Sequence, residues 1–365
     1  MRLSSIFTND IRAGKLFNIP AQPINVMLDV TNSCNNHCLF CYNPKDFAYQ
    51  SDRPDVVSLT QIVSIIGGNG TKEILYLGGE PFSFSGMRDV LRTGKKYGMF
   101  QRAVSNGSFL KDRATCRNLK DSGLDEVGIS FHSSRETVHD KLAGRKGSFR
   151  DAMSAIENSL SAGIATFIQY SPSCLNSAGD IIELGKNIKN FFADRIAYFD
   201  INRLLPLGRG SNNQDLFIED DNWFLFLCEA TELYQQEFDV HAELTPYCWL
   251  KIKAEVHGIA DNILDALFRL NRGCFMWVAQ LALDYRGRIK FCPAGASVGP
   301  SLLEVQWPDF WKTWEVFEQY RSFLWNDICI DFETKSVCSF FYRCLGGCKY
   351  SRGTHYEVDR YAIVN

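Results

Sequence analysis

Between about residue 24 and residue 202, short apolar runs alternate with helical patterns, and this alternation limits the possible folds more than any other feature of the chain. The runs are rich in Val, Ile, Phe or Tyr and are bounded by Gly, Asn, Ser or Asp, as strands are. We expect strands at 24–30, 73–77, 100–105, 125–131, 164–170 and 196–201. Because strand–helix alternation produces parallel strands, the expected fold class is α/β, a partial (β/α)6 TIM barrel. Functional groups then belong at the carboxyl ends of the strands.

The pattern changes near residues 206–210, and this change sets the expected domain organisation. Residues 1–23 form an N-terminal extension, and residues 24–215 form the barrel. Residues 216–272 have helical patterns and bridge to a small α+β domain of hairpin and helix at 273–365. That domain begins with a hairpin at 279–291 and ends in a cysteine cluster.

Composition restricts the class of protein. The 365-residue chain has a formal net charge of -3, with 45% hydrophobic and 22% charged residues, as folded globular proteins do. We expect neither nucleic acid nor a membrane as a partner, since general binders of both are basic. No apolar run approaches about 18 residues and no signal-peptide core is present, so we expect a cytoplasmic location. Disulfides are rare there, and the thirteen cysteines point to metal ligation instead.

Three cysteines follow the first expected strand directly, in the segment Cys34-Asn35-Asn36-His37-Cys38-Leu39-Phe40-Cys41. Three thiolates within eight residues can bind three corners of a cubane iron–sulfur cluster and leave the fourth iron without a protein ligand. The alternative is structural zinc, which usually takes four protein ligands, commonly from paired C-x2-C units. The spacing here is C-x3-C-x2-C, with an aromatic residue before the last cysteine.

This segment resembles the motif of radical S-adenosylmethionine (SAM) enzymes, C-x3-C-x-aromatic-C. The resemblance implies a [4Fe–4S] cluster on Cys34, Cys38 and Cys41, with SAM chelating the open iron. It also implies that one electron from an external donor, such as a flavodoxin or ferredoxin, cleaves SAM to a 5′-deoxyadenosyl radical. That radical abstracts a hydrogen atom from the substrate. Phe40 would lie near the adenine, although an aromatic residue here is equally consistent with packing.

Further segments support the resemblance at the ends of later strands. The residues it assigns to SAM are Gly78, Gly79 and Glu80 of GGEP, Ser105 and Asn106 of SNG, Ser130, Arg145 of HDKLAGRKGSF, and Gln169. Glycines are expected in GGEP because a side chain would block the close approach of a ligand. Each segment also has an ordinary structural interpretation, as a turn or a solvated arginine. Many relatives carry an aspartate shortly after the position of Ser130, and this chain does not.

A second group of cysteines lies near the C-terminus. Its members resemble the SPASM extension, or the shorter twitch extension, which hold auxiliary [4Fe–4S] clusters. The resemblance implies metal ligation by Cys274, Cys292, Cys338, Cys344 and Cys348, with Cys248 and Cys329 as weaker substitutes. Lys335 stands where the full pattern has a cysteine, and no cysteine follows Cys348. We therefore expect one auxiliary cluster; a structural zinc site is the alternative. Cys116, Cys174 and Cys228 are expected to be buried free thiols.

The resemblance implies a radical SAM oxidoreductase, and relatives with such extensions mostly modify peptides. The leading hypothesis is a maturase that crosslinks, oxidises or epimerises a ribosomally made peptide. Since 23 residues precede the first expected strand, a leader-peptide domain is expected to be missing or separately encoded. The alternative enzyme is a dehydrogenase or epimerase of sugars or aminocyclitols. A third hypothesis is a cluster- or zinc-bearing scaffold that has lost SAM chemistry.

Overall fold

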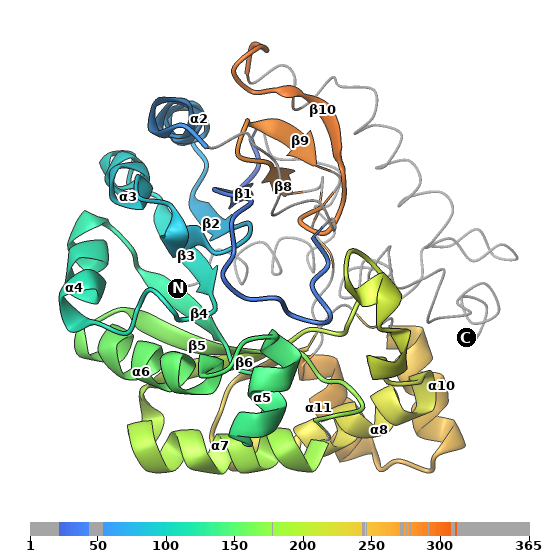
Figure 1. Ribbon diagram of the computed structural model, residues 1–365. Coiled ribbons are helices and arrows are strands. Elements are labelled where there is room, and N and C mark those ends of the chain that lie inside the picture. The colour runs from blue at the N-terminus through green and yellow to red at the C-terminus, as the bar shows by residue number, and fades with distance from the viewer. Residues whose placement is uncertain are drawn as a thin grey trace, which may run out of the picture.

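The computed structural model describes residues 22–43, 54–176, 178–242, 245, 247–270, 274, 276, 279–290, 292–307 and 311. Within this part, one twisted sheet has the strand order β10-β9-β8-β1-β2-β3-β4-β5-β6-β7 (Figure 1). The six strands expected from the sequence are all present: β1 Asn25–Asp29, β2 Glu73–Leu77, β3 Phe100–Ser105, β4 Glu126–Ser130, β5 Ala165–Tyr170 and β6 Ile196–Ile201. All six run parallel. The prediction of an α/β partial barrel is therefore confirmed.

Helices cover the convex face of this sheet (Figure 1). They are α2 Val56–Gly68, α3 Met87–Lys96, α4 Arg113–Ser122, α5 Glu136–Ala143, α6 Ser148–Ser161 and α7 Ala178–Phe192. Local chemistry sets their ends: the Asp112 carboxylate caps α4 by accepting the Ala114 and Thr115 N–H groups, and Gly123 ends it in the left-handed conformation. In α2, Leu59, Ile62, Val63 and Ile66 are buried. Each such side chain contributes about 1.5–3 kcal/mol by leaving water.

Alternation along the strands separates two faces of the sheet. Residues such as Leu28, Ile74 and Val127 are fully buried in the core beneath the helices. On the concave face, the Arg102 side chain bonds to Glu73 at 2.7 Å, to Glu126 at 2.5 Å and to the Tyr198 hydroxyl at 2.5 Å. This layer joins β2, β3, β4 and β6 near the strand starts. Because a buried guanidinium needs such partners, the layer specifies how the strands close around the lumen.

The sheet extends beyond the six expected strands at both edges. β7, Val240–Ala242, pairs in parallel with β6, within a segment whose helical patterns did not indicate a strand. The helices around it are α8 Asp220–Ala230, α9 Glu232–Gln235, α10 Tyr247–Val256 and α11 Asp261–Leu270. Short 3-10 turns lie earlier in the chain: η2 Pro81–Ser83, η3 Ala193–Arg195, η4 Gly210–Asn212 and η5 Gln214–Leu216. A three-residue strand is too short to produce a period of its own.

At the other edge, the expected hairpin is present as β8, Gln280–Leu283, and β9, Arg288–Lys290, and it is followed by β10, Ser297–Ser301. β8 pairs in parallel with β1, so the hairpin continues the barrel sheet (orange in Figure 1). In the described part of the chain, no helix is long and apolar enough to cross a membrane.

Candidate functional site

The first three cysteines lie in the loop after β1, and α5 holds one side of this loop. The His37 N–H donates to the Ala143 carbonyl oxygen at 3.1 Å. The Leu39 N–H donates to the Leu142 carbonyl oxygen at 3.0 Å. Gly144 follows α5 with φ of 63°, and a Cβ there would lie 2.3 Å from the His37 carbonyl oxygen. The last turn of α5 therefore packs so closely against the cysteine loop that only glycine fits.

The segment after β6 holds the other side of the loop. The Arg209 backbone N–H donates to the Cys41 carbonyl oxygen at 2.8 Å, and its side-chain Nε donates to the Cys38 carbonyl oxygen at 2.9 Å. The Asn213 amide donates to the Leu39 carbonyl oxygen at 3.0 Å. Contacts from two sides thus hold the loop backbone while leaving its thiols available to a ligand.

The three cysteine thiols lie close enough to affect one another electrostatically. Burial first, and then neighbouring groups that include Cys41, raise the pKa of Cys34 to about 11 and the pKa of Cys38 to about 12. Thiolates can persist at such a site only beside a positive charge, and a bound metal centre supplies one. The electrostatics of the site therefore fit a metal-bound state.

The arrangement of ligands distinguishes between the two metal centres considered from the sequence. In the ranges that the structure describes, no three His, Cys, Asp or Glu side chains form a group that could hold a metal ion. A structural zinc ion requires four ligands about 2.0–2.3 Å from one point. A cubane cluster instead takes one thiolate at each iron, so its ligands lie farther apart. Three thiols are one ligand short of a structural zinc site and match the three protein-bound irons of a cubane cluster.

Gly78 and Gly79, after β2, lie against the same loop. Gly78 has φ of +124°, and a Cβ there would lie 2.4 Å from the Thr31 carbonyl oxygen. A Cβ on Gly79 would lie 2.2 Å from the Ser33 carbonyl oxygen. The expected reason for these glycines was the approach of a ligand, but the neighbour in the structure is the backbone that leads into Cys34.

Glu80 is buried and joins the end of β2 to the end of β3. Its carboxylate accepts hydrogen bonds from the Phe82 N–H at 3.1 Å, the Ser105 hydroxyl at 2.9 Å and the Asn106 N–H at 2.8 Å. Burial raises the pKa of Glu80 to about 7, although these three hydrogen bonds oppose the shift. The GGEP and SNG segments are therefore one unit held together by this carboxyl group.

Asn106 brings this unit to the first cysteine. Its side-chain amide donates to the Asn35 carboxamide oxygen at 2.9 Å and lies 3.8 Å from the Cys34 sulfur. Ser105, in contrast, is buried against Glu80. Of these two predicted cofactor contacts, only Asn106 touches a cysteine side chain.

The HDKLAGRKGSF segment builds the support beneath the loop. The Asp140 carboxylate caps α6 by accepting the Gly147 N–H at 2.6 Å and the Phe149 N–H at 2.9 Å. The His139 Nδ1 accepts the His132 N–H at 3.1 Å. Burial lowers the pKa of His139 to about 4, so the ring is neutral and acts as a fixed connector.

Arg145 is aimed from this segment at the cysteine loop. Its Nε donates to the Asn36 carboxamide oxygen at 2.5 Å, and one Nη pairs with Asp151 at 2.8 Å. The other nitrogen, Nη2, is buried and has no hydrogen-bond partner among the residues that the structure describes. An unpaired buried guanidinium nitrogen disfavours the empty state and fits a carboxylate ligand beside the cysteines.

Phe40 is held in place by a histidine that the sequence patterns did not single out. The His132 ring meets the Phe40 ring edge-on, with centroids 4.9 Å apart and an interplanar angle of 85°. The His132 Nδ1 accepts the Ser171 N–H at 3.3 Å, and burial lowers the pKa of His132 well below its usual value. A neutral, fixed histidine therefore sets the orientation of Phe40.

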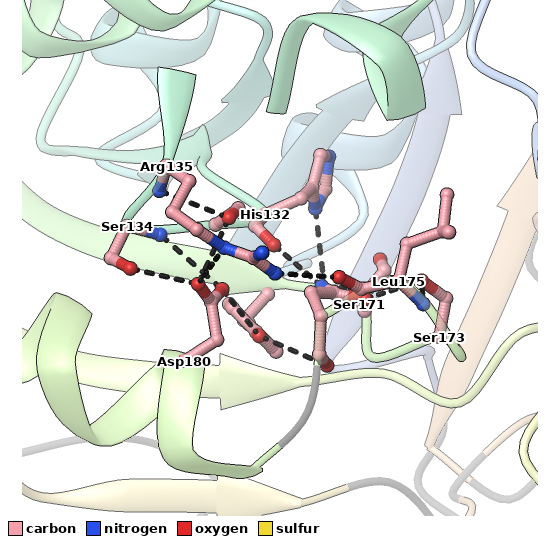
Figure 2. Close-up of polar contacts among 10 residues, drawn as sticks. His132, Ser134, Arg135, Ser171, Ser173, Leu175 and Asp180 are labelled. Atoms are coloured by element: carbon pink, nitrogen blue, oxygen red, sulfur yellow. Dashed lines mark hydrogen bonds and ion pairs between the residues drawn. The ribbon is translucent and has the colours of Figure 1, made fainter. Parts of the chain in front are cut away.

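Asp180 organises the loops around His132, as Figure 2 shows. Its carboxylate accepts hydrogen bonds from the Ser133 and Ser134 hydroxyls at 3.0 and 2.7 Å, and from the Tyr170 hydroxyl at 3.2 Å. Arg135 adds an ion pair at 3.4 Å. Asp180 and these partners come from three segments, so no local spacing signals the cluster in the sequence.

Ser130 and Gln169 lie side by side at the carboxyl ends of β4 and β5. They are paired in register, and both are partly exposed. Neither contacts the cysteine loop through a hydrogen bond in the described part of the chain. They lie across the mouth of the barrel, on the same face of the sheet as the Arg102 layer.

The second group of cysteines is described only in part. Cys274 and Cys292 are partly buried, and the backbone of Cys248 lies in α10. The predictions for Cys329, Cys338, Cys344 and Cys348 lie outside the described residues.

A buried ion pair connects the Cys292 segment to the barrel. The Lys290 ammonium bonds to the Asp29 carboxylate and to the Pro293 carbonyl oxygen, both at 2.6 Å. The side chains of Lys290 and Asp29 are 5% and 3% exposed. Burial raises the pKa of Tyr42, and Asp29, Cys41 and Cys292 raise it further. Tyr42 therefore lies near Asp29, Cys41 and Cys292.

Comparison with known proteins gives one family and two kinds of relative. Residues 28–171 match the model of the radical SAM superfamily. The structure of SuiB from Streptococcus suis bound to precursor peptide SuiA matches with a TM-score of 0.70 at 16% identity, over 96% of this chain and 77% of that one. The structure of anSMEcpe with bound AdoMet and the Cp18Cys peptide matches with a TM-score of 0.65 at 16% identity, over 92% and 91% of the two chains.

In sequence, the chain is similar to a protein that is named for a porphyrin and not for a peptide. It is 27% identical over 260 residues to the Fe-coproporphyrin III synthase of Methanosarcina barkeri. The match covers 68% of this chain and 63% of the relative, so the chain spans less than two thirds of that protein's length.

Proposed function

We propose that this chain, whose residues 28–171 form a radical SAM domain, cleaves S-adenosylmethionine reductively at a [4Fe–4S] cluster held by Cys34, Cys38 and Cys41. The observation that carries the proposal is the loop that bears three neighbouring cysteines, held by α5 on one side and by Arg209 on the other. A cluster bound there supplies, after reduction by an external flavodoxin or ferredoxin, the electron that releases a 5′-deoxyadenosyl radical.

The chain's own residues then bind and orient SAM. The buried Nη2 of Arg145 is available for the SAM carboxylate, and Asn106 offers its amide next to Cys34. Phe40, fixed by His132, provides an apolar ring for the adenine. The other proposed contacts are Gly78, Gly79, Glu80, Ser105, Ser130 and Gln169. Of these, Glu80 and Ser105 act chiefly by holding Asn106 in place.

We propose a peptide as the substrate, modified by crosslinking, oxidation or epimerisation. SuiB and anSMEcpe, whose structures contain bound peptides, support this class because the chain shares their fold over nearly its whole length. The second candidate is an iron porphyrin, because the Methanosarcina relative is named for Fe-coproporphyrin III. The two candidates differ in charge, since coproporphyrins carry several carboxylates and peptides need carry none.

We also propose one auxiliary [4Fe–4S] cluster in a C-terminal domain that begins near residue 273. Its ligands would be Cys274, Cys292 and Cys348, with Cys338 or Cys344 as the fourth. The position of Cys292 after the β8–β9 hairpin, tied to β1 through Lys290, supports a site at the open edge of the barrel.

Anaerobic reconstitution with iron and sulfide, followed by reductant and SAM, tests the proposal. We expect 5′-deoxyadenosine by mass spectrometry, and none after Cys34, Cys38 and Cys41 are all changed to Ala. Cys228→Ala, in α8, is the matched control and should retain the activity. Iron should fall from roughly eight to roughly four atoms per chain in the triple variant, at four irons per cubane. A fully loaded parent protein that forms no 5′-deoxyadenosine with either peptide or porphyrin candidates would refute the proposal.

A further inference from the structure

The concave face of the barrel carries a row of polar side chains, and one of them, Asp200, is not among the proposed SAM contacts. The bonds of Arg102 across the lumen identify this face, because they reach Glu126 on β4 and Tyr198 on β6. Residues an even number apart on a strand share a face. Ser130 therefore lies on the face of Glu126, and Asp200 on that of Tyr198.

Strand register places these residues next to one another. Ser130 pairs with Gln169, and Gln169 pairs with Asp200. All three stand at the carboxyl ends of their strands and are partly exposed. In barrel enzymes this end forms the binding site. The row Ser130–Gln169–Asp200 is thus presented to whatever enters the lumen.

Two side chains of this row, those of Asp200 and Gln169, have hydrogen-bonding groups that the described residues do not use. The Asp200 carboxylate accepts one hydrogen bond, from the Asn202 amide at 3.3 Å, and has no ion pair within the described part of the chain. The carboxamide of Gln169 makes no side-chain hydrogen bond to the described residues. A partly exposed carboxylate without a cation is best satisfied by a positively charged hydrogen-bond donor.

The other charged side chains on the concave face also favour a cationic ligand. Arg102 is bonded to both Glu73 and Glu126, and Lys290 is bonded to Asp29. Among the described residues of β1 to β6 and β9, the concave face carries four carboxylates and two cations, and on β7 His241 pairs in register with Asp200. An excess of carboxylates on one face produces a local field that attracts cations and repels anions.

We propose that Asp200, with Gln169 beside it, forms a recognition site for a cationic side chain of the substrate, either an ammonium or a guanidinium group. The inference rests on the proposed function and narrows it to a peptide with Lys or Arg near the modified position. The same field disfavours an iron porphyrin, because its carboxylates would face Asp200.

Binding to the reconstituted, SAM-loaded protein under anaerobic conditions tests this site. The probes are the blocked tripeptides Ac-Ala-Lys-Ala-NH2 and Ac-Ala-Glu-Ala-NH2 and iron coproporphyrin III, measured by equilibrium dialysis. We expect the Lys peptide to bind at least about tenfold more tightly than the Glu peptide, as one favourable charge contact allows. Asp200→Asn should reduce that ratio to below about twofold. Glu157→Gln removes one charge from the exposed outer side of α6 and should leave the ratio unchanged.

Three outcomes would overturn the inference: equal binding of the two peptides, tighter binding of the porphyrin than of the Lys peptide, or an unchanged ratio in Asp200→Asn. A loss of SAM affinity in Asp200→Asn would overturn it too, because Asp200 would then belong to the cofactor site. Formation of 5′-deoxyadenosine is measured separately in the same preparations. A protein that forms it without any charge preference refutes the recognition site and leaves the proposed SAM chemistry standing.

Discussion

The two groups of cysteines are attached to the barrel in different ways. Around Cys34, Cys38 and Cys41, support is distributed over α5, the segment after β6 and the ends of β2 and β3. Around Cys292, the described connection is concentrated in β-sheet pairing and one buried ion pair, Lys290–Asp29. Distributed support tolerates the loss of any one contact, whereas a concentrated link fails when one partner is removed.

The largest expected loss of stability follows from breaking the Lys290–Asp29 ion pair. Lys290→Met leaves the Asp29 carboxylate buried without its cation, and we expect the free energy of unfolding to fall by about 3–5 kcal/mol. Denaturant unfolding monitored by circular dichroism measures the change. Lys290→Arg keeps the charge and should recover at least half of the loss. A change of less than about 1 kcal/mol in Lys290→Met would mean that the hairpin is held chiefly by its strand pairing.

A pH-dependent loss of stability, of intermediate size, is expected at His139, which supports the loop that carries Cys34, Cys38 and Cys41. Because burial lowers the pKa of His139 to about 4, the unfolded chain binds a proton between pH 6.5 and 4 that the folded chain does not. The free energy of unfolding therefore decreases as pH falls from 6.5 to 4, by about 3 kcal/mol in total. Below pH 4 both states carry the proton, and His139 has no further effect. His139→Gln should flatten this part of the profile of unfolding free energy against pH. An identical slope in parent and variant would contradict the assignment.

The smallest effect is expected from a single contact to the cysteine loop. Asn213→Ala removes the hydrogen bonds to the Leu39 and Arg209 carbonyl oxygens, and we expect a loss of about 1–2 kcal/mol in unfolding free energy. Iron content after reconstitution should stay near that of the parent, because α5 still holds the loop. If iron binding were lost while the fold persisted, support of the loop would not be distributed.

Features with a local sequence pattern could be predicted from the sequence, whereas features assembled by the fold could not. The six parallel strands and the hairpin were predictable because each has its own apolar run and turn residues. The thiol motif was predictable because its spacing is local. β7 was not, since three residues carry no period. His132 and Asp180 were not, because their partners come from segments brought together only by the fold.

Gly78 and Gly79 show the same limit of prediction from the sequence. The pattern GGEP correctly placed two glycines beside the cysteine motif, but the sequence does not reveal what fills the space next to them. The structure places the backbone of Thr31 and Ser33 there, so the requirement for glycine comes from chain packing. A motif can thus mark the right place while its physical cause is different.

The pairing of β8 with β1 has a consequence for how the protein is made. Asn25 meets Gln280 across 255 residues of sequence, so one edge of the strand that leads into the cysteines stays unpaired until the hairpin emerges from the ribosome. At about 5–20 residues per second, that delay is roughly 10–50 s. During this interval β1 is exposed to wrong partners, and contacts of such long range also form slowly. The strand that leads into the cysteines is therefore synthesised well before the hairpin that closes its sheet edge.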